Sequence, residues 1–306
     1  QIIKFGQSLQ ARYLQALGHD VEFPEDGYKG DDIIELAKMH IELYGNKLEN
    51  VDEEERQHEL VEFALDKNVT NMVNDLKNYG INYDVFFSEK TLHNSGAITD
   101  VIDKMKEMGS VYEKDDAVWF KGTDYGLEKD EVLIRKNGVP TYYAADIAYH
   151  YDKLVKRNID YAINVWGADH HGHVARLKKA MVALGVSEDR LEVILMQLVR
   201  LVKGDEQVRM SKRKGNIFTL SDLVDEVGKD AARFIFNYNK PNTHMDFVLD
   251  LAIKKSSENP VFYVQYAHAR ICSIIRNINK EVKIENFDLL DKKEELNLLK
   301  VIANFS

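Results

Sequence analysis

The chain has 306 residues, of which 44% are hydrophobic and 30% are charged, a composition typical of globular proteins and unlike that of disordered or collagen-like chains. Its single cysteine excludes an intramolecular disulfide and a cysteine-rich zinc site, which favours a reducing compartment and therefore the cytoplasm. We expect neither a membrane span nor a signal peptide, and the formal net charge of −10 argues against a protein that coats a polyanion over its whole surface.

Helical periodicity dominates the first 110 residues. The acidic run at 52–55 interrupts it and is interpreted as the solvated first turn of a helix. Ser88 is expected to cap a helix that reaches Met105. The expected elements are a helix at 2–17 ending at Gly18, a strand at 19–23, three helical patterns between 30 and 80, and a period-two segment from Tyr83 to Phe87.

After residue 110 the pattern predicts hairpins and then alternating strands and helices. The Asn137-Gly138 pair suits a type I′ turn between two strands. The later alternation predicts parallel strands joined by crossover helices, and thus an α/β fold. The expected strands are 118–120, 132–134, 139–143, 161–166 and 191–198, and the expected helices are 144–157, 173–184, 220–238 and most of the chain from 252 onward.

Two polar clusters follow predicted strands, where a doubly wound sheet binds its ligands. In the first, Asp146 is placed in the first turn of a helix; it can bind a cation or simply stabilise the helix dipole. In the second, Gly167 allows a ligand to approach the backbone, Asp169 can accept from ribose hydroxyls, and three histidines at 170, 171 and 173 offer hydrogen-bond donors. Zinc is disfavoured, because neighbouring histidines do not easily point at one ion; helix-capping or internally bonded histidines are the alternative.

A third cluster, at 208–216, combines four cations with Ser211 and Gly215. Such a loop can follow a polyphosphate, although alone it is as consistent with a solvated basic loop. Neither a P-loop nor a Gly-x-Gly-x-x-Gly motif occurs. The lone Cys272 lies in an apolar helical pattern and is expected in a core.

Together these motifs resemble those of the class I aminoacyl-tRNA synthetases, and specifically of arginyl-tRNA synthetases of bacterial type. The segment Arg209-Met210-Ser211-Lys212-Arg213 is similar to the Lys-Met-Ser-Lys-Ser loop of the class, and Gly167-Ala168-Asp169 to its Gly-x-Asp motif. Residues 140–148 resemble the substrate strand of the arginyl enzymes, and further resemblance lies at 23–30 and 259–270.

The resemblance implies a partial Rossmann-like nucleotide fold with an α+β insertion, followed by an all-α anticodon-binding domain. The implied limits are 1–23 and 131–200 for the catalytic fold, 24–130 for the insertion, 201–228 for the Met-Ser-Lys loop and its connection, and 229–306 for the helical domain.

The implied reaction is ATP-dependent activation of L-arginine and transfer of the arginyl group to tRNA(Arg). Mg²⁺ would accompany ATP, no structural metal is expected, and a cytoplasmic monomer is expected. The residues implied are Lys212 and Ser211 for catalysis; Gly167, Asp169, His173, Met210, Ser211 and Lys212 for ATP; Tyr142, Asp146 and His170 for arginine; and Tyr266 and Arg270 for tRNA.

One motif of the class is matched only out of place. His170-His171-Gly172-His173 fits His-x-Gly-His, but it lies close before the Met-Ser-Lys loop rather than far upstream of it, so we interpret the match as coincidence. Residues 1–17 resemble the helix that follows the true signature, which we therefore expect to lie outside this chain, with part of the arginine pocket. Alternatives are another class I synthetase, such as a cysteinyl or glutamyl enzyme, and a non-catalytic nucleic-acid-binding module derived from a synthetase.

Overall fold

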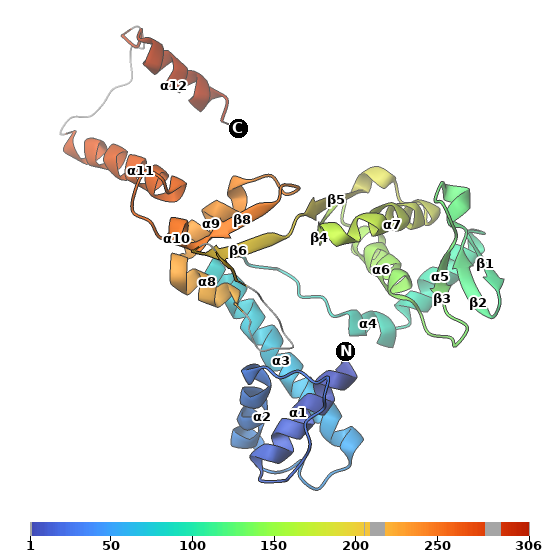
Figure 1. The fold of residues 1–306 in the computed structure, drawn as a ribbon. Coiled ribbons are helices and arrows are strands. Elements are labelled where there is room, and N and C mark those ends of the chain that lie inside the picture. Colours follow the sequence, from blue (N-terminus) through green and yellow to red (C-terminus); the bar gives the residue numbers. More distant parts are fainter. Residues whose placement is uncertain (1, 205, 209–217, 279–288, 306) are drawn as a thin grey trace. The chain divides into compact units, whose positions relative to one another are not determined.

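The computed structural model describes residues 2–204, 206–208, 218–278 and 289–305. Their contacts divide the chain into two compact units, Gln1–Ile253 and Lys254–Ser306, and each is described by itself. The first unit contains three hydrophobic clusters and all the described strands (Figure 1). No helix among the described residues is both long and apolar enough to cross a lipid bilayer.

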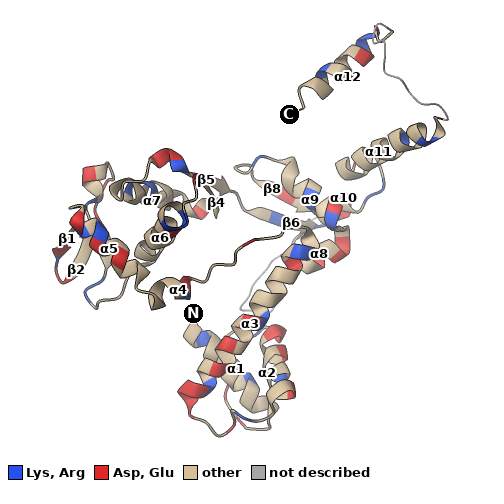
Figure 2. Cartoon of the chain, turned by 180° about the vertical axis from the view of Figure 1, so that it is seen from behind, with Lys and Arg blue, Asp and Glu red and all other residues tan. Residues whose placement is uncertain are grey.

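The first cluster is formed by three helices, α1 (Ile2–Ala16), α2 (Asp31–Tyr44) and α3 (Glu53–Tyr79). The side chain of Asp52 caps α3 by accepting from the backbone N–H of Glu55, which confirms the acidic run as a first turn. Acidic residues occupy the first turns of α2 and α3 (Figure 2), where the positive ends of the helix dipoles favour them.

The second cluster joins short helices, an antiparallel sheet and the α/β segment. The sheet has the order β1-β2-β3, and β4 pairs in parallel with β5, as the alternation of elements predicts. Helix α7 connects these two strands. The elements are α4 (Glu89–Asn94), α5 (Ala97–Glu107), β1 (Val111–Lys114), β2 (Ala117–Phe120), a 3₁₀ turn (Gly122–Tyr125), β3 (Glu131–Ile134), α6 (Tyr142–Tyr151), a π-helical turn (Asp152–Lys156), β4 (Ala162–Gly167), a 3₁₀ turn (Ala168–His170), α7 (His171–Ala183), a 3₁₀ turn (Glu188–Arg190) and β5 (Leu191–Met196).

The third cluster packs the last turn of α3 against a small sheet of order β7-β6-β8 and its helices. Arg233 on α9 donates to the carbonyls of Tyr79 and Gly80, where α3 ends. Gly80 adopts φ +90°, a left-handed conformation that suits glycine at a helix end. The elements are β6 (Val199–Lys203), β7 (Glu206–Gln207), α8 (Leu220–Val227), α9 (Lys229–Tyr238), β8 (Met245–Val248) and α10 (Leu249–Ala252).

The second unit contributes two described helices, α11 (Pro260–Asn277) and α12 (Lys293–Ala303). Asn259 caps α11 by accepting from Val261, and Pro260 occupies its first position, where a missing N–H costs nothing. Cys272 is partly exposed rather than in a core, and its Sγ lies 3.4 Å from Nε2 of His268.

Several expected elements differ in the structure. Residues 19–23 and 83–87 form no strand. The last two helical patterns before residue 80 are one helix, α3, and the helix expected after Ser88 is two, divided at Gly96. The helix expected at 220–238 is divided at Gly228, and β8 was not anticipated.

The expected type I′ turn is also elsewhere. Only Gly138 of the Asn137-Gly138 pair has positive φ, whereas Asp115 and Asp116 both do, at 53° and 58°. These two aspartates join β1 to β2, since Lys114 pairs directly with Ala117. They therefore form the two-residue turn whose conformation matches strand twist.

Candidate active site

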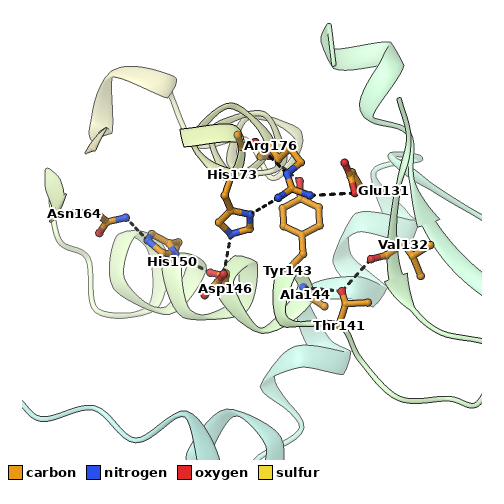
Figure 3. Close-up of polar contacts among 11 residues, drawn as sticks. Glu131, Val132, Thr141, Tyr143, Ala144, Asp146, His150, Asn164, His173 and Arg176 are labelled. Atoms are coloured by element: carbon orange, nitrogen blue, oxygen red, sulfur yellow. Dashed lines mark hydrogen bonds and ion pairs between the residues drawn. The ribbon is translucent and has the colours of Figure 1, made fainter. Parts of the chain in front are cut away.

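Asp146 is placed by the start of α6. Thr141 caps this helix by accepting from the N–H of Ala144, while its hydroxyl donates to the carbonyl of Val132 at 2.9 Å and so ties α6 to β3 (Figure 3). The strand expected at 139–143 is wrong, because Tyr142 and Tyr143 already belong to the helix. Asp146 consequently lies in the second turn, where stabilisation of the helix dipole no longer explains it.

The carboxylate of Asp146 is held by His173 of α7. Nε2 of His173 lies 2.8 Å from Oδ2 of Asp146. The other oxygen, Oδ1, has no bonding partner among the described residues, and the Asp146 side chain is 43% exposed. One oxygen is thus fixed by the protein and the other remains accessible to a ligand.

Arg176, one turn further along α7, contacts the other ring nitrogen of the same histidine. Its Nη2 lies 3.2 Å from Nδ1 of His173, and its Nη1 lies 3.4 Å from Oε2 of Glu131 on β3 (Figure 3). The guanidinium also lies over the ring of Tyr143, whose hydroxyl donates to the carbonyl of Arg176. Burial raises the pKa of Tyr143, and the nearby Glu131 carboxylate adds to this, so the phenol stays protonated.

A second histidine supports α6 from within the core. Nδ1 of His150 lies 2.7 Å from the carbonyl of Asp146, and Nε2 lies 2.7 Å from Nδ2 of Asn164 on β4. Since Lys153 donates to the amide oxygen of Asn164, the amide nitrogen faces the ring, and Nε2 must accept from it. Burial and the charge of Lys153 lower the pKa of His150, which keeps the ring neutral and its proton on Nδ1.

The structure brings five of the eleven predicted site residues together around one cavity of about 1270 Å³. Its lining includes five carboxylates and three Lys or Arg residues, which favours a cationic ligand. Tyr142 lies in the lining of this cavity and is 81% exposed. The predicted residues that line it are Tyr142, Asp146, Asp169, His170 and His173.

Three further predicted residues, Gly167, Tyr266 and Arg270, do not line this cavity. Gly167 ends β4, and a Cβ at this position would lie 2.5 Å from Oδ1 of Asp169, so a side chain would displace the carboxylate. Tyr266 and Arg270 contact each other on α11, in the second unit. Met210, Ser211 and Lys212 lie outside the described residues.

Sequence reasoning missed Arg176, Glu131 and Trp166. Trp166 precedes Gly167 and its ring lies 5.5 Å from that of His173 and 6.1 Å from that of His170, between centroids. Arg176 was detectable, because it follows His173 by three positions on a predicted helix. Glu131 was not detectable, because it lies far from Arg176 in the sequence and only the tertiary fold brings the two side chains together.

Comparison with known proteins identifies two families. The sequence model for class I tRNA synthetases of the arginine type, catalytic domain, matches residues 10–275, and that for the DALR anticodon-binding domain matches residues 264–306. Similar curated relatives are named arginine–tRNA ligase. One from Caldanaerobacter subterraneus is 57% identical and one from Ruminiclostridium cellulolyticum is 52% identical, each over 100% of this chain. The chain spans only 55% and 56% of the length of these two relatives.

Solved structures agree in fold. A crystal structure from Campylobacter jejuni described as an arginyl-tRNA synthetase superposes with a TM-score of 0.82 at 39% identity, covering 92% of this chain and 61% of that one. The Thermus thermophilus arginyl-tRNA synthetase superposes with a TM-score of 0.66 at 18% identity, over 92% of this chain and 57% of that one, and shows the fold alone. With a family match over most of its length, this chain belongs to the class I tRNA synthetases of the arginine type, with a catalytic fold followed by residues that match a DALR anticodon-binding domain.

Proposed function

We propose that the protein containing this chain is an arginine–tRNA ligase, which activates L-arginine with ATP and transfers the arginyl group to the terminal adenosine of tRNA(Arg). One observation carries the proposal: the Asp146 carboxylate faces a mainly acidic cavity with one oxygen bound to His173 and the other open. A guanidinium is a rigid fork of N–H donors, and a carboxylate is its natural acceptor.

The other roles follow the family resemblance. Tyr142 and His170 stand at the rim of the same cavity and would contact arginine from either side of Asp146. Gly167 is the last residue of β4 and Asp169 follows it, at the carboxyl end of a parallel strand, where both would receive the ATP ribose. Lys212, with Ser211 and Met210, would hold the phosphates as charge moves onto the leaving pyrophosphate; such catalysis is mainly positioning and charge stabilisation.

Mg²⁺ would come with ATP. Phosphate oxygens are among the hard ligands that Mg²⁺ prefers, so the substrate itself would help to hold the ion. Tyr266 and Arg270 of α11 would contact tRNA. The enzyme is proposed to act as a cytoplasmic monomer, and the domain limits implied by the resemblance remain predictions.

The deciding experiment measures amino-acid-dependent ATP–pyrophosphate exchange by the full-length protein in the presence of tRNA(Arg). We expect exchange with arginine and none with methionine, cysteine or glutamate. Exchange with another amino acid would identify a different class I synthetase, and tRNA binding without exchange would identify a non-catalytic module.

A variant tests the role of Asp146 directly. Asp146→Asn keeps the size of the side chain but removes its charge, so arginine should lose roughly 2 kcal/mol of binding, or about thirtyfold in KM. The parent enzyme should reject citrulline, whose side chain is neutral, and the variant should reject it much less. If the two enzymes discriminated arginine from citrulline equally well, Asp146 would not be the partner of the guanidinium.

A further inference from the structure

We infer that Glu131, Arg176 and His173 form a positioning chain, which fixes Asp146 in the orientation that selects arginine. This inference rests on the proposed function and deepens it. It also gives His173 a different role from the one implied by family resemblance, because it places this side chain in the arginine pocket rather than among the ATP ligands.

The hydrogen-bond donors determine where the histidine proton lies. A guanidinium has five N–H donors and no acceptor, so Nδ1 of His173, 3.2 Å from Nη2 of Arg176, can only accept. The ring proton is therefore on Nε2, from which it is donated to Oδ2 of Asp146 at 2.8 Å. Arg176 and Asp146 therefore select the same tautomer, because the other one would place two donors face to face at Nδ1 and two acceptors face to face at Nε2. Without Arg176, Nδ1 loses its donor and the ring is held by a hydrogen bond at Nε2 alone.

Arg176 is itself held from three sides. Its Nη1 pairs with Oε2 of Glu131 at 3.4 Å, its Nε donates to the carbonyl of Gly172 at 3.2 Å, and its guanidinium lies over the ring of Tyr143. The Glu131 side chain is only 15% exposed, so this pair is less screened than a surface ion pair. The arginine consequently has little freedom to turn away from His173.

The ring of His173 is also fixed by packing. Its side chain is 14% exposed, and it lies against Trp166 and the edge of Tyr143. A donor held this firmly prevents the Asp146 carboxylate from rotating. Oδ1 is then kept toward the cavity, where a ligand guanidinium can reach it.

The first test replaces Arg176, which is linked to Asp146 through His173. Arg176→Met in the full-length enzyme should raise KM for arginine roughly tenfold or more, the value of one hydrogen bond to a charged group, with kcat and the KM for ATP changed less than about twofold. The matched control is Lys179→Met, which removes a charge from the same helix and, among the described residues, breaks an ion pair with Glu188. It should leave both KM values unchanged.

Two histidine variants separate positioning from mere packing. His173→Gln keeps an N–H donor for Asp146 and should retain most of the affinity for arginine and most of the discrimination against citrulline. His173→Phe keeps the ring volume but has no donor, and should lose both.

The result that overturns the inference is a Phe or Met variant with unchanged KM for arginine, or one in which KM for ATP rises instead. The latter outcome would restore His173 to the nucleotide site. Failure of the proposed function is recognised separately, because the parent enzyme would then show no arginine-dependent exchange at all.

Discussion

At the scale of single residues, the polar side chains packed beside α6 are hydrogen-bonded so that the tautomer of each ring and the orientation of each amide are fixed. His150 is buried and neutral, and its two nitrogens are matched to a carbonyl and an amide. Asn164 and Lys153 complete the set. Burial, together with the charge of Arg157, lowers the pKa of Lys153, whose ammonium is shielded by the ring of Tyr149.

This arrangement predicts a loss of stability in acid. The pKa of His150 is lowered in the folded state, so the unfolded chain binds more protons once the pH falls below about 6.5, the ordinary value for histidine. The free energy of unfolding should therefore fall from pH 7 toward pH 5, by at most about 1.4 kcal/mol per pH unit for this one group.

Urea unfolding at a series of pH values checks this with His150→Gln. The variant lacks the titrating ring, so it should be less stable than the parent at pH 7 but should lose less stability between pH 7 and pH 5. The second buried histidine, His40, also has a lowered pKa and is present in both proteins, so its contribution cancels. Parallel pH curves would show that His150 binds its proton equally well in the folded and in the unfolded chain.

The residue types of the cavity could be predicted from the sequence, but their mutual bonds could not. Asp146, His170 and His173 attract notice because acids and histidines follow predicted strands. Nothing in the sequence tells that the third histidine bonds the acid of another helix, since residues 146 and 173 meet only through the packing of α6 on α7.

At the scale of elements, the two-residue hairpin turn forms at Asp115-Asp116 and not at the Asn137-Gly138 pair, although Asn-Gly is the more common sequence for such a turn. The Asn137-Gly138 pair is followed by Pro140, which has no N–H to donate to a ladder, and by the cap of α6, so no second strand forms there. The hairpin forms at two aspartates, which tolerate left-handed backbone less well than Asn-Gly. Strands expected at 19–23 and 83–87 fail for another reason: two or three alternating apolar residues do not specify a partner strand.

The strained aspartates predict a stabilising substitution. Asp116→Gly removes the cost of φ +58° for an L residue and should raise the free energy of unfolding by about 0.5 kcal/mol, after the added freedom of the unfolded chain is counted. Asp160→Gly is the control, because Asp160 is an exposed loop aspartate without positive φ. This variant should be less stable than the parent, because glycine only adds conformational freedom to the unfolded chain. Urea unfolding compares both with the parent; equal losses in both variants would show that the turn is not strained.

At the scale of the whole molecule, the long helix α3 contributes residues to two of the hydrophobic clusters. One end packs among α1 and α2 through Leu60 and Ala64, and its last residue, Tyr79, belongs to the cluster around β6 and β8. Arg233 fastens this end through the carbonyls of Tyr79 and Gly80. The class I fold could be predicted from the sequence motifs. The continuity of α3 could not, because the polar sequence in its exposed middle looks like a loop between two helices.

The second unit leads to a prediction about autonomous folding. Among its described residues only Asn259 and Val261 are buried, while Ile271, Ile274 and Ile275 are more than half exposed. Helices of this length are marginal in water without packing. A peptide of residues 254–306 should therefore show, by far-ultraviolet circular dichroism, less than about half the helix that the structure assigns to it.

Residues 1–253 supply the comparison, because all three hydrophobic clusters lie within them. This fragment should unfold cooperatively on heating. A fully helical 254–306 peptide would show instead that its helices are stable on propensity alone.

The position of the two tryptophans has a practical consequence. Trp119 lines the cavity from β2, and Trp166, on β4, lies beside His170 and His173, which also line it. No other tryptophan occurs in the 306 residues. Indole fluorescence from this chain therefore originates entirely beside the cavity, which gives the protein a built-in optical reporter of ligand arrival without any label.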